Sequence, residues 1–135
     1  MRKIYSKTGE LLNIICSVDD LGASNRVDVT DPEYSLQLGL MQAPEGHVFK
    51  PHAHLDREVQ KTLHIVEAFV IMKGWAIIRI FDTDLLPISE YLLRTGDVTI
   101  LLNGGHSLEI GEDCKILEFK TGPYEGRDKD KIWIE

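Results

Sequence analysis

Cysteine is scarce in this sequence of 135 residues: Cys16 and Cys114 are the only two, and they form no C-x-x-C pair. We therefore expect two free, buried thiols, as a reducing cytoplasm permits, and no disulfide. Neither cysteine has a histidine near it in the sequence, which argues against a catalytic thiol.

Clustered positive charge and long apolar runs are also missing. The formal net charge is −7, and the basic residues of the tail at 127–132 alternate with aspartates. A phosphate backbone requires a basic stripe, so nucleic acid is excluded as the expected partner. No apolar run approaches the roughly 20 residues that span a bilayer. The first residues lack the apolar core of a secretory signal, so we expect a cytoplasmic protein without a membrane partner.

The length predicts one domain over residues 1–135. A chain of this size buries about two thirds of its unfolded surface, so it can fold without a stabilising disulfide or metal. We expect the core over about residues 35–120, with N-terminal strands and a C-terminal arm packing on it.

Short apolar runs separated by turn signals predict an all-β fold, either a sandwich or a jelly-roll barrel. Only residues 18–23 and 55–63 have a weakly helical pattern. The expected strands cover residues 2–5, 11–16, 35–42, 47–54, 64–72, 75–82, 88–94, 97–102, 106–110 and 114–120.

Two turns have the pattern of tight hairpins. Lys73-Gly74 would place Met72 opposite Trp75, and Asn103-Gly104 would place His106 beside Leu101. The first hairpin would put Glu67 on one face with only apolar neighbours, namely Phe69, Ile71, Ala76, Ile78 and Ile80. The opposite face is apolar too, so a partner subunit or the N-terminal strands must cover it.

The most informative pattern is a set of four polar residues on three expected strands: His52, His54, Glu67 and His106. His52 and His54 are two residues apart and point the same way. Glu67 and His106 are each a lone polar group on an apolar face. A buried carboxylate is costly unless it is paired, hydrogen-bonded or bound to a metal. Imidazole and carboxylate together suit Zn, Fe, Ni or Cu and leave positions open for a substrate.

Single histidines have simpler interpretations. Core or surface histidines with hydrogen-bond partners would be the default for any one of them. A shared site is favoured for the four residues because they occur together. His47 and His64 have the wrong parity and are expected at the surface or in packing. Residues 55–63 are expected to form a charged surface loop or a lid.

At these residues the sequence resembles the cupin superfamily. Gly46, His52, His54, Glu67 and Gly74 match its first motif, and Gly96, Gly104 and His106 match the second. The sequence departs from the motifs in three places. Twelve residues separate His54 from Glu67, Leu102 replaces a proline, and His106 follows Gly104 one residue early. The ending from Leu117 is similar to a subgroup of single-domain cupins with an E-x-K-x-GPY-x-G tail, often encountered among genes for surface polysaccharide and nucleotide-sugar synthesis.

The resemblance implies a jelly-roll cupin barrel and a homodimer. It implies one divalent transition metal (Fe, Mn, Ni or Zn) bound by His52, His54, Glu67 and His106. The expected function is an enzyme of isomerase, epimerase or lyase type on a small sugar or nucleotide-linked sugar, with the metal as Lewis acid. No catalytic residue is assigned. The alternatives are an Fe(II)-dependent cupin dioxygenase, a non-catalytic module that binds a sugar or other small ligand, and a metal-free isomerase with His52 or His54 as general base.

Overall fold

The computed structural model describes residues 1–48, 51, 65–121 and 132–134. The prediction of an all-β fold is confirmed: within these residues there are ten strands, one short 3₁₀ helix and no α-helix. No helix in this part of the chain is long and apolar enough to cross a bilayer. The elements are β1 (Arg2–Tyr5), β2 (Leu11–Ser17), η1 (Val18–Leu21), β3 (Arg26–Asp28), β4 (Gly39–Met41), β5 (Glu67–Lys73), β6 (Trp75–Phe81), β7 (Pro87–Arg94), β8 (Asp97–Leu101), β9 (Gly105–Ile110) and β10 (Lys115–Lys120).

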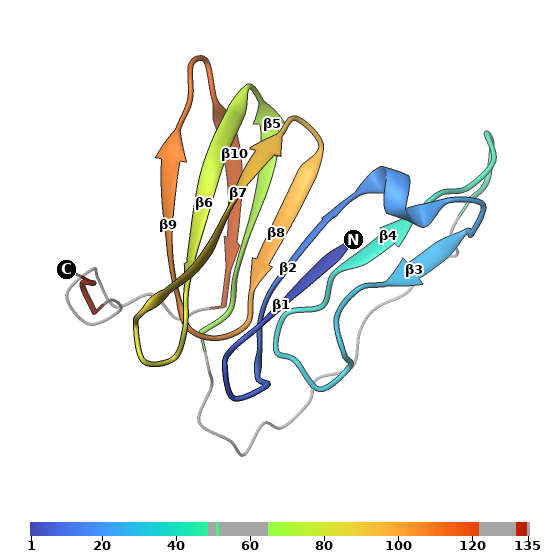
Figure 1. Cartoon of the computed structure of the whole chain (residues 1–135). Coiled ribbons are helices and arrows are strands. Elements are labelled where there is room, and N and C mark those ends of the chain that lie inside the picture. The colour runs from blue at the N-terminus through green and yellow to red at the C-terminus, as the bar shows by residue number, and fades with distance from the viewer. Residues whose placement is uncertain (49–50, 52–64, 122–131, 135) are drawn as a thin grey trace.

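The strands form three antiparallel sheets (Figure 1). The largest sheet has the order β1-β2-β8-β5-β10, the second has the order β7-β6-β9, and β3 pairs with β4. The three-stranded sheet lies against one face of the five-stranded sheet, and the β3-β4 pair lies on the other side, next to β1 and β2 (Figure 1). Within the described residues these sheets are open and form no closed barrel.

The two predicted hairpins are wrong: both turns are corners at which the chain passes from one sheet to the other. β5 pairs with β8 and β10, while β6 pairs with β7 and β9, so Met72 is not opposite Trp75. His106 pairs with Ile80 on β6, and Leu101 pairs with Glu67 on β5. Two-residue turns rich in glycine suit hairpins and sheet corners alike, so the turn sequence alone does not decide between them.

The corners place apolar side chains between the two larger sheets. One continuous cluster contains Phe69 and Ile71 from β5 with Ala76, Ile78 and Ile80 from β6. The prediction that these five side chains share one face of a hairpin is therefore wrong: they meet in one core, but from two facing sheets. Complete burial of each large aliphatic side chain contributes about 1.5–3 kcal/mol, so this interface is a substantial source of stability.

The outer face of the five-stranded sheet is covered by the N-terminal part of the chain. Ile14, Val98 and Ile100 pack there against Leu21 from η1 and Leu40 from β4, with Val29 completing the cluster. This covering is one of the two predicted for the second apolar face, and it reaches Ala68 and Val70 of β5 but not Trp75 and Ile77, which lie in the other sheet. It ends before β10, where Leu117 and Phe119 remain about half exposed.

The remaining strand predictions have mixed outcomes. The strand expected over 35–42 shortens to β4, and β3 was not predicted because its sequence, Arg-Val-Asp, has a single apolar residue. The weakly helical residues 18–23 contain η1. Of the strand expected over 47–54, the described residues His47, Val48 and Pro51 are not in a strand. Its other residues and the stretch 55–63 lie outside the described residues.

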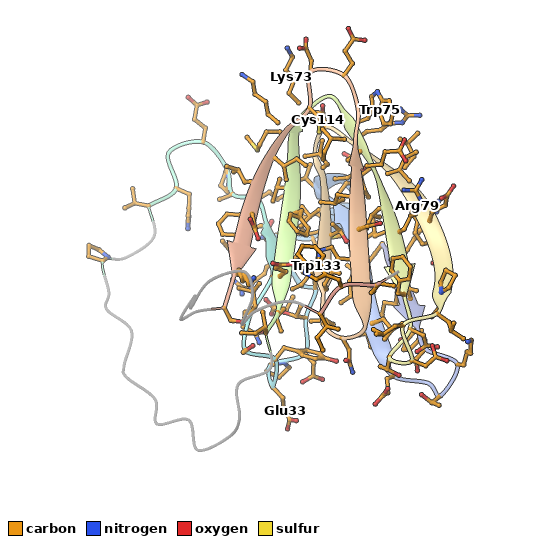
Figure 2. All side chains as sticks on the ribbon, turned by 90° about the vertical axis from the view of Figure 1, so that its left-hand side faces the viewer. Glu33, Lys73, Trp75, Arg79, Cys114 and Trp133 are labelled. Carbon is orange, nitrogen blue, oxygen red and sulfur yellow. The ribbon has the colours of Figure 1, made fainter. Side chains whose placement is uncertain are left out.

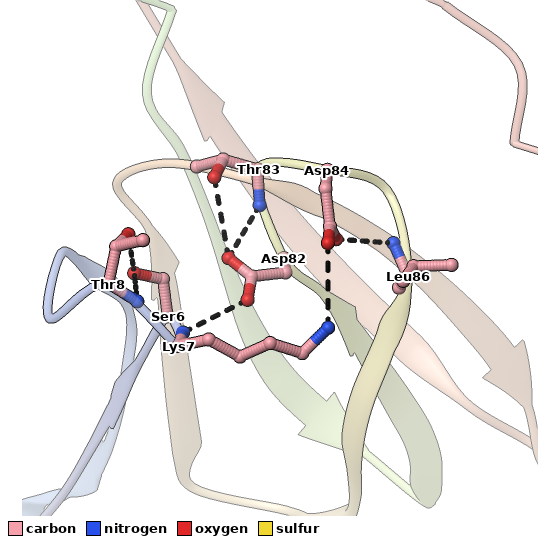
Figure 3. A network of polar contacts seen from close by, with 7 residues as sticks. All are labelled: Ser6, Lys7, Thr8, Asp82, Thr83, Asp84 and Leu86. Atoms are coloured by element: carbon pink, nitrogen blue, oxygen red, sulfur yellow. Dashed lines mark hydrogen bonds and ion pairs between the residues drawn. The ribbon is translucent and has the colours of Figure 1, made fainter.

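A polar network joins the β1–β2 turn to the β6–β7 loop (Figure 3). The Asp82 carboxylate accepts hydrogen bonds from the backbone N–H groups of Lys7 (3.0 Å) and Thr83 (2.7 Å). Asp84 accepts one from the N–H of Leu86 and forms an ion pair with Lys7 at 3.4 Å. The hydrogen bonds, chiefly that from Lys7, hold the pKa of Asp82 below its ordinary value of 3.8.

Candidate functional site

Glu67 is the first residue of β5 and lies on the inner face of the five-stranded sheet. Its neighbours in the same row across the sheet are Leu101 on β8 and Lys120 on β10. Its side chain is only 9% exposed. A carboxylate at such a position needs compensating partners, since burial disfavours its charge.

The second predicted ligand, His106, reaches Glu67 from the opposite sheet. His106 lies on β9 next to Ile80 of β6, and its Nε2 is 3.3 Å from Oε2 of Glu67. The imidazole also packs against the ring of Phe69, with 5.6 Å between ring centroids and 54° between planes. Two of the four predicted ligands therefore converge, and each comes from a different sheet.

Lys120 was not predicted as part of this site. Its Nζ is 3.1 Å from Oε1 of Glu67, and its side chain is 16% exposed. The contact is an ion pair, because Oε1 accepts no well-angled hydrogen bond within the described part of the chain. Alternation along β10 puts Ile116, Glu118 and Lys120 on one face, but only the β5–β10 pairing reveals that this face contains Glu67.

The other two predicted ligands, His52 and His54, lie outside the described residues, as does His64. His47 is exposed in a turn where its backbone N–H donates to the carbonyl of Pro44, at 3.1 Å. No group of three or more His, Cys, Asp or Glu side chains in residues 1–48, 51, 65–121 and 132–134 is arranged to hold a metal. A four-ligand site would therefore need His52 and His54 as well.

The distance between Glu67 and His106, the two predicted ligands that the structure describes, is compatible with a shared metal ion. Ligand atoms about 2.0–2.2 Å from one tetrahedral ion are roughly 3.3–3.6 Å apart. The 3.3 Å between Glu67 Oε2 and His106 Nε2 is compatible with that range. The apolar surroundings and the ligands fixed on strands provide the rigid setting that a metal site requires.

The C-terminal end of the chain approaches the same strand that carries His106. A Cβ at Gly105 would lie 2.5 Å from Cδ1 of Ile134, so a larger residue there would require the Ile134 side chain to shift. Figure 2 shows Trp133, the preceding residue, in front of the strands and well below Lys73 and Cys114. Ile134 therefore lies beside Gly105, the residue that precedes His106 on β9.

A buried polar pair lies further along the inner face. Thr99 on β8 donates to the side-chain oxygen of Asn13 on β2 at 3.0 Å, and both residues are fully buried. Asn13 is in the same row as Leu101 and Glu67. Its Nδ2 has no hydrogen-bond acceptor among the described residues.

A cavity of about 200 Å³ lies away from Glu67, between β1, β2 and β7. Its lining includes Tyr91, Asp97 and Arg2, whose guanidinium lies 5.4 Å from the centre of the Tyr91 ring. Ligand pockets for small molecules usually measure about 300–1,000 Å³, so this cavity is small for a substrate.

Both cysteines are free, as predicted; Cys16 is buried and Cys114 is half-buried. Burial, with a smaller effect of the Asp20 charge, raises the pKa of Cys16 to about 11. A thiol with this pKa is protonated at neutral pH and is a poor nucleophile. The interpretation of Cys16 as a structural residue is thereby supported.

No model of a known protein family matches this chain, no curated protein matches it, and no solved structure matches it. The fold is all-β with antiparallel sheets, and the candidate site is the group of Glu67, His106 and Lys120.

Proposed function

We propose that this chain is a metal-binding protein of the cupin class, with His52, His54, Glu67 and His106 as ligands of one divalent transition metal. The observation that carries the proposal is the 3.3 Å contact between Glu67 and His106 across two sheets. These residues were selected from the sequence as lone polar groups on apolar faces. Their convergence favours a common site over independent packing roles.

The finer fold proposal is a jelly-roll barrel. Its support is the path of the chain, which crosses between the two larger sheets after β5, β7, β8 and β9. Such alternation builds a double-sheet jelly roll, in which inward-facing side chains surround a cavity. The strand expected over 47–54 would carry His52 and His54 to the same interior.

The chemistry proposed for the site is that of a small enzyme acting on a sugar or nucleotide-linked sugar. A bound divalent metal would supply Lewis-acid polarisation of a carbonyl or hydroxyl oxygen. Glu67 and His106 would hold that ion at the end of an apolar interface, beside Phe69 and Ile80. The sugar is supported only by the resemblance of the C-terminal sequence to the polysaccharide-associated subgroup.

The proposal is tested by the metal content of the untagged protein, measured by plasma mass spectrometry. We expect about one equivalent of metal per chain in the wild type and a reduced content in His106→Ala, whose three remaining ligands would bind the ion more weakly. His47→Ala is the matched control, since His47 is an exposed histidine of a turn, and it should retain the metal. A wild type without metal after supplementation with Fe, Mn, Ni and Zn would contradict the proposal.

A metal-loaded preparation also separates the enzyme hypotheses. Isomerase, epimerase or lyase chemistry consumes no oxygen, whereas a dioxygenase does. Oxygen uptake by the iron-loaded protein in the presence of a substrate would replace the first hypothesis with the second. Saturable sugar binding without turnover would identify a binding module.

A further inference from the structure

We infer that Lys120 is a resident counter-cation of Glu67, and that it competes with a metal for that carboxylate. The inference deepens the proposed function, on whose metal site it rests. The two oxygens of Glu67 have different neighbours: Oε1 lies 3.1 Å from Lys120 Nζ, and Oε2 lies 3.3 Å from His106 Nε2. The carboxylate is thus held between a cation on β10 and an imidazole on β9.

Burial distinguishes this ion pair from the other lysine–carboxylate pairs of the described chain. The side chains of Lys120 and Glu67 are 16% and 9% exposed. Those of Lys73 and Asp113, 3.2 Å apart at the other end of β5, are 58% and 77% exposed. Figure 2 shows Lys73 at one end of the strands, well away from Trp133. Water screens an exposed pair almost completely, whereas a buried pair keeps most of its interaction.

A buried carboxylate without a cation would be strongly unfavourable in the metal-free protein. Lys120 removes this difficulty, because its ammonium neutralises Glu67 in place. The metal-free chain can therefore fold with the Glu67 side chain already directed between the two sheets. Metal binding is then an addition to a formed site and not a condition of folding.

The same ammonium opposes metal binding. A divalent ion held by Glu67 would lie close to the positive charge of Lys120 in a poorly solvated region. Like charges in such a region repel strongly, since the effective dielectric constant is low. The single negative charge of Glu67 would also have to balance both the ammonium group and the metal ion. Removal of the Lys120 charge is therefore expected to tighten metal binding and to weaken the metal-free fold.

The experiment uses the full chain as wild type, Lys120→Met and Lys73→Met. Zn²⁺ and Mn²⁺ affinities are measured by competition with a chromophoric chelator, and Tm is measured in EDTA and in each metal. We expect Lys120→Met to bind metal at least about tenfold more tightly than the wild type. Its Tm should be lower in EDTA and should rise more with metal. Lys73→Met should match the wild type in both measurements.

Equal or weaker metal binding by Lys120→Met, with a wild type that binds metal, would overturn the inference and leave the proposed function intact. Absence of metal binding in all three proteins would instead overturn the proposed function, and with it the competition. If Lys120→Met fails to fold, the double variant Glu67→Gln/Lys120→Met provides the second test. Its recovery to a cooperative transition supports the counter-cation role, and its failure to recover contradicts it.

Discussion

At the scale of single residues, Glu67 is the centre of the candidate site, because it contacts both His106 and Lys120. Replacement of one carboxylate oxygen by an amide in Glu67→Gln removes the anionic ligand and nearly preserves the volume. We expect metal affinity to fall at least about 100-fold, since a neutral amide is a poor ligand for these metals. Isothermal titration with Zn²⁺ measures the change.

The control for Glu67→Gln is Glu109→Gln on the same pair of sheets. Glu109 is an exposed partner of Arg79, with 2.6 Å between Oε2 and Nη2. Its substitution should leave metal affinity unchanged. Equal losses in both variants would point to a general electrostatic effect and not to a ligand role for Glu67.

The thiol of Cys16 provides a prediction that concerns the fold alone. Its burial and its pKa of about 11 keep it protonated and inaccessible in the native protein. With Ellman's reagent at pH 8 we expect slow or absent labelling of Cys16 until denaturant unfolds the chain. Cys16→Ala identifies the signal of Cys114. Rapid native labelling at Cys16 would contradict its burial in the apolar cluster that covers the outer face of the five-stranded sheet.

At the scale of elements, the sequence predicts the strands well and their partners poorly. Alternation and turn residues locate β1, β2 and β5 to β10 within about three residues, because burial on one or both faces dictates the side-chain pattern. Strand pairing depends on contacts between distant segments, which no local pattern contains. Both glycine turns were therefore interpreted as hairpins, and Lys120 was missed because it meets Glu67 only through the β5–β10 pairing.

The contact between the β6–β7 loop and the β1–β2 turn, made by Asp82 and the backbone N–H of Lys7, can be tested by its dependence on pH. The folded-state pKa of Asp82 is depressed, so its stabilising effect is present above the unfolded value and is lost as pH falls through the folded value. We expect Asp82→Asn to lower Tm at pH 7, and the difference from wild type to shrink below about pH 4. Thermal unfolding followed by circular dichroism between pH 2 and 7 measures this.

A Tm difference for Asp82→Asn that stays constant across that pH range would contradict the assignment of the effect to the Asp82 charge. Asp84→Asn is the neighbouring control. Its carboxylate is half exposed and accepts one backbone N–H, from Leu86, so a smaller effect is expected.

At the scale of the whole molecule, we propose a homodimer. The exposed apolar side chains Met72, Leu117 and Phe119 on β5 and β10 support the proposal, because the N-terminal covering does not reach them. A contiguous exposed apolar area of this kind favours association. We expect Phe119→Ser to shift the sedimentation coefficient from dimer to monomer with little change in Tm. A monomeric wild type would contradict the proposal.

The central claim is that His52, His54, Glu67 and His106 bind one metal ion. It is tested most directly by X-ray absorption at the metal edge of the loaded protein. We predict light-atom ligands only, with the multiple scattering of three imidazoles in the wild type and of two in His106→Ala. Sulfur scattering, or an imidazole signal that the His106→Ala substitution leaves unchanged, would contradict the claim.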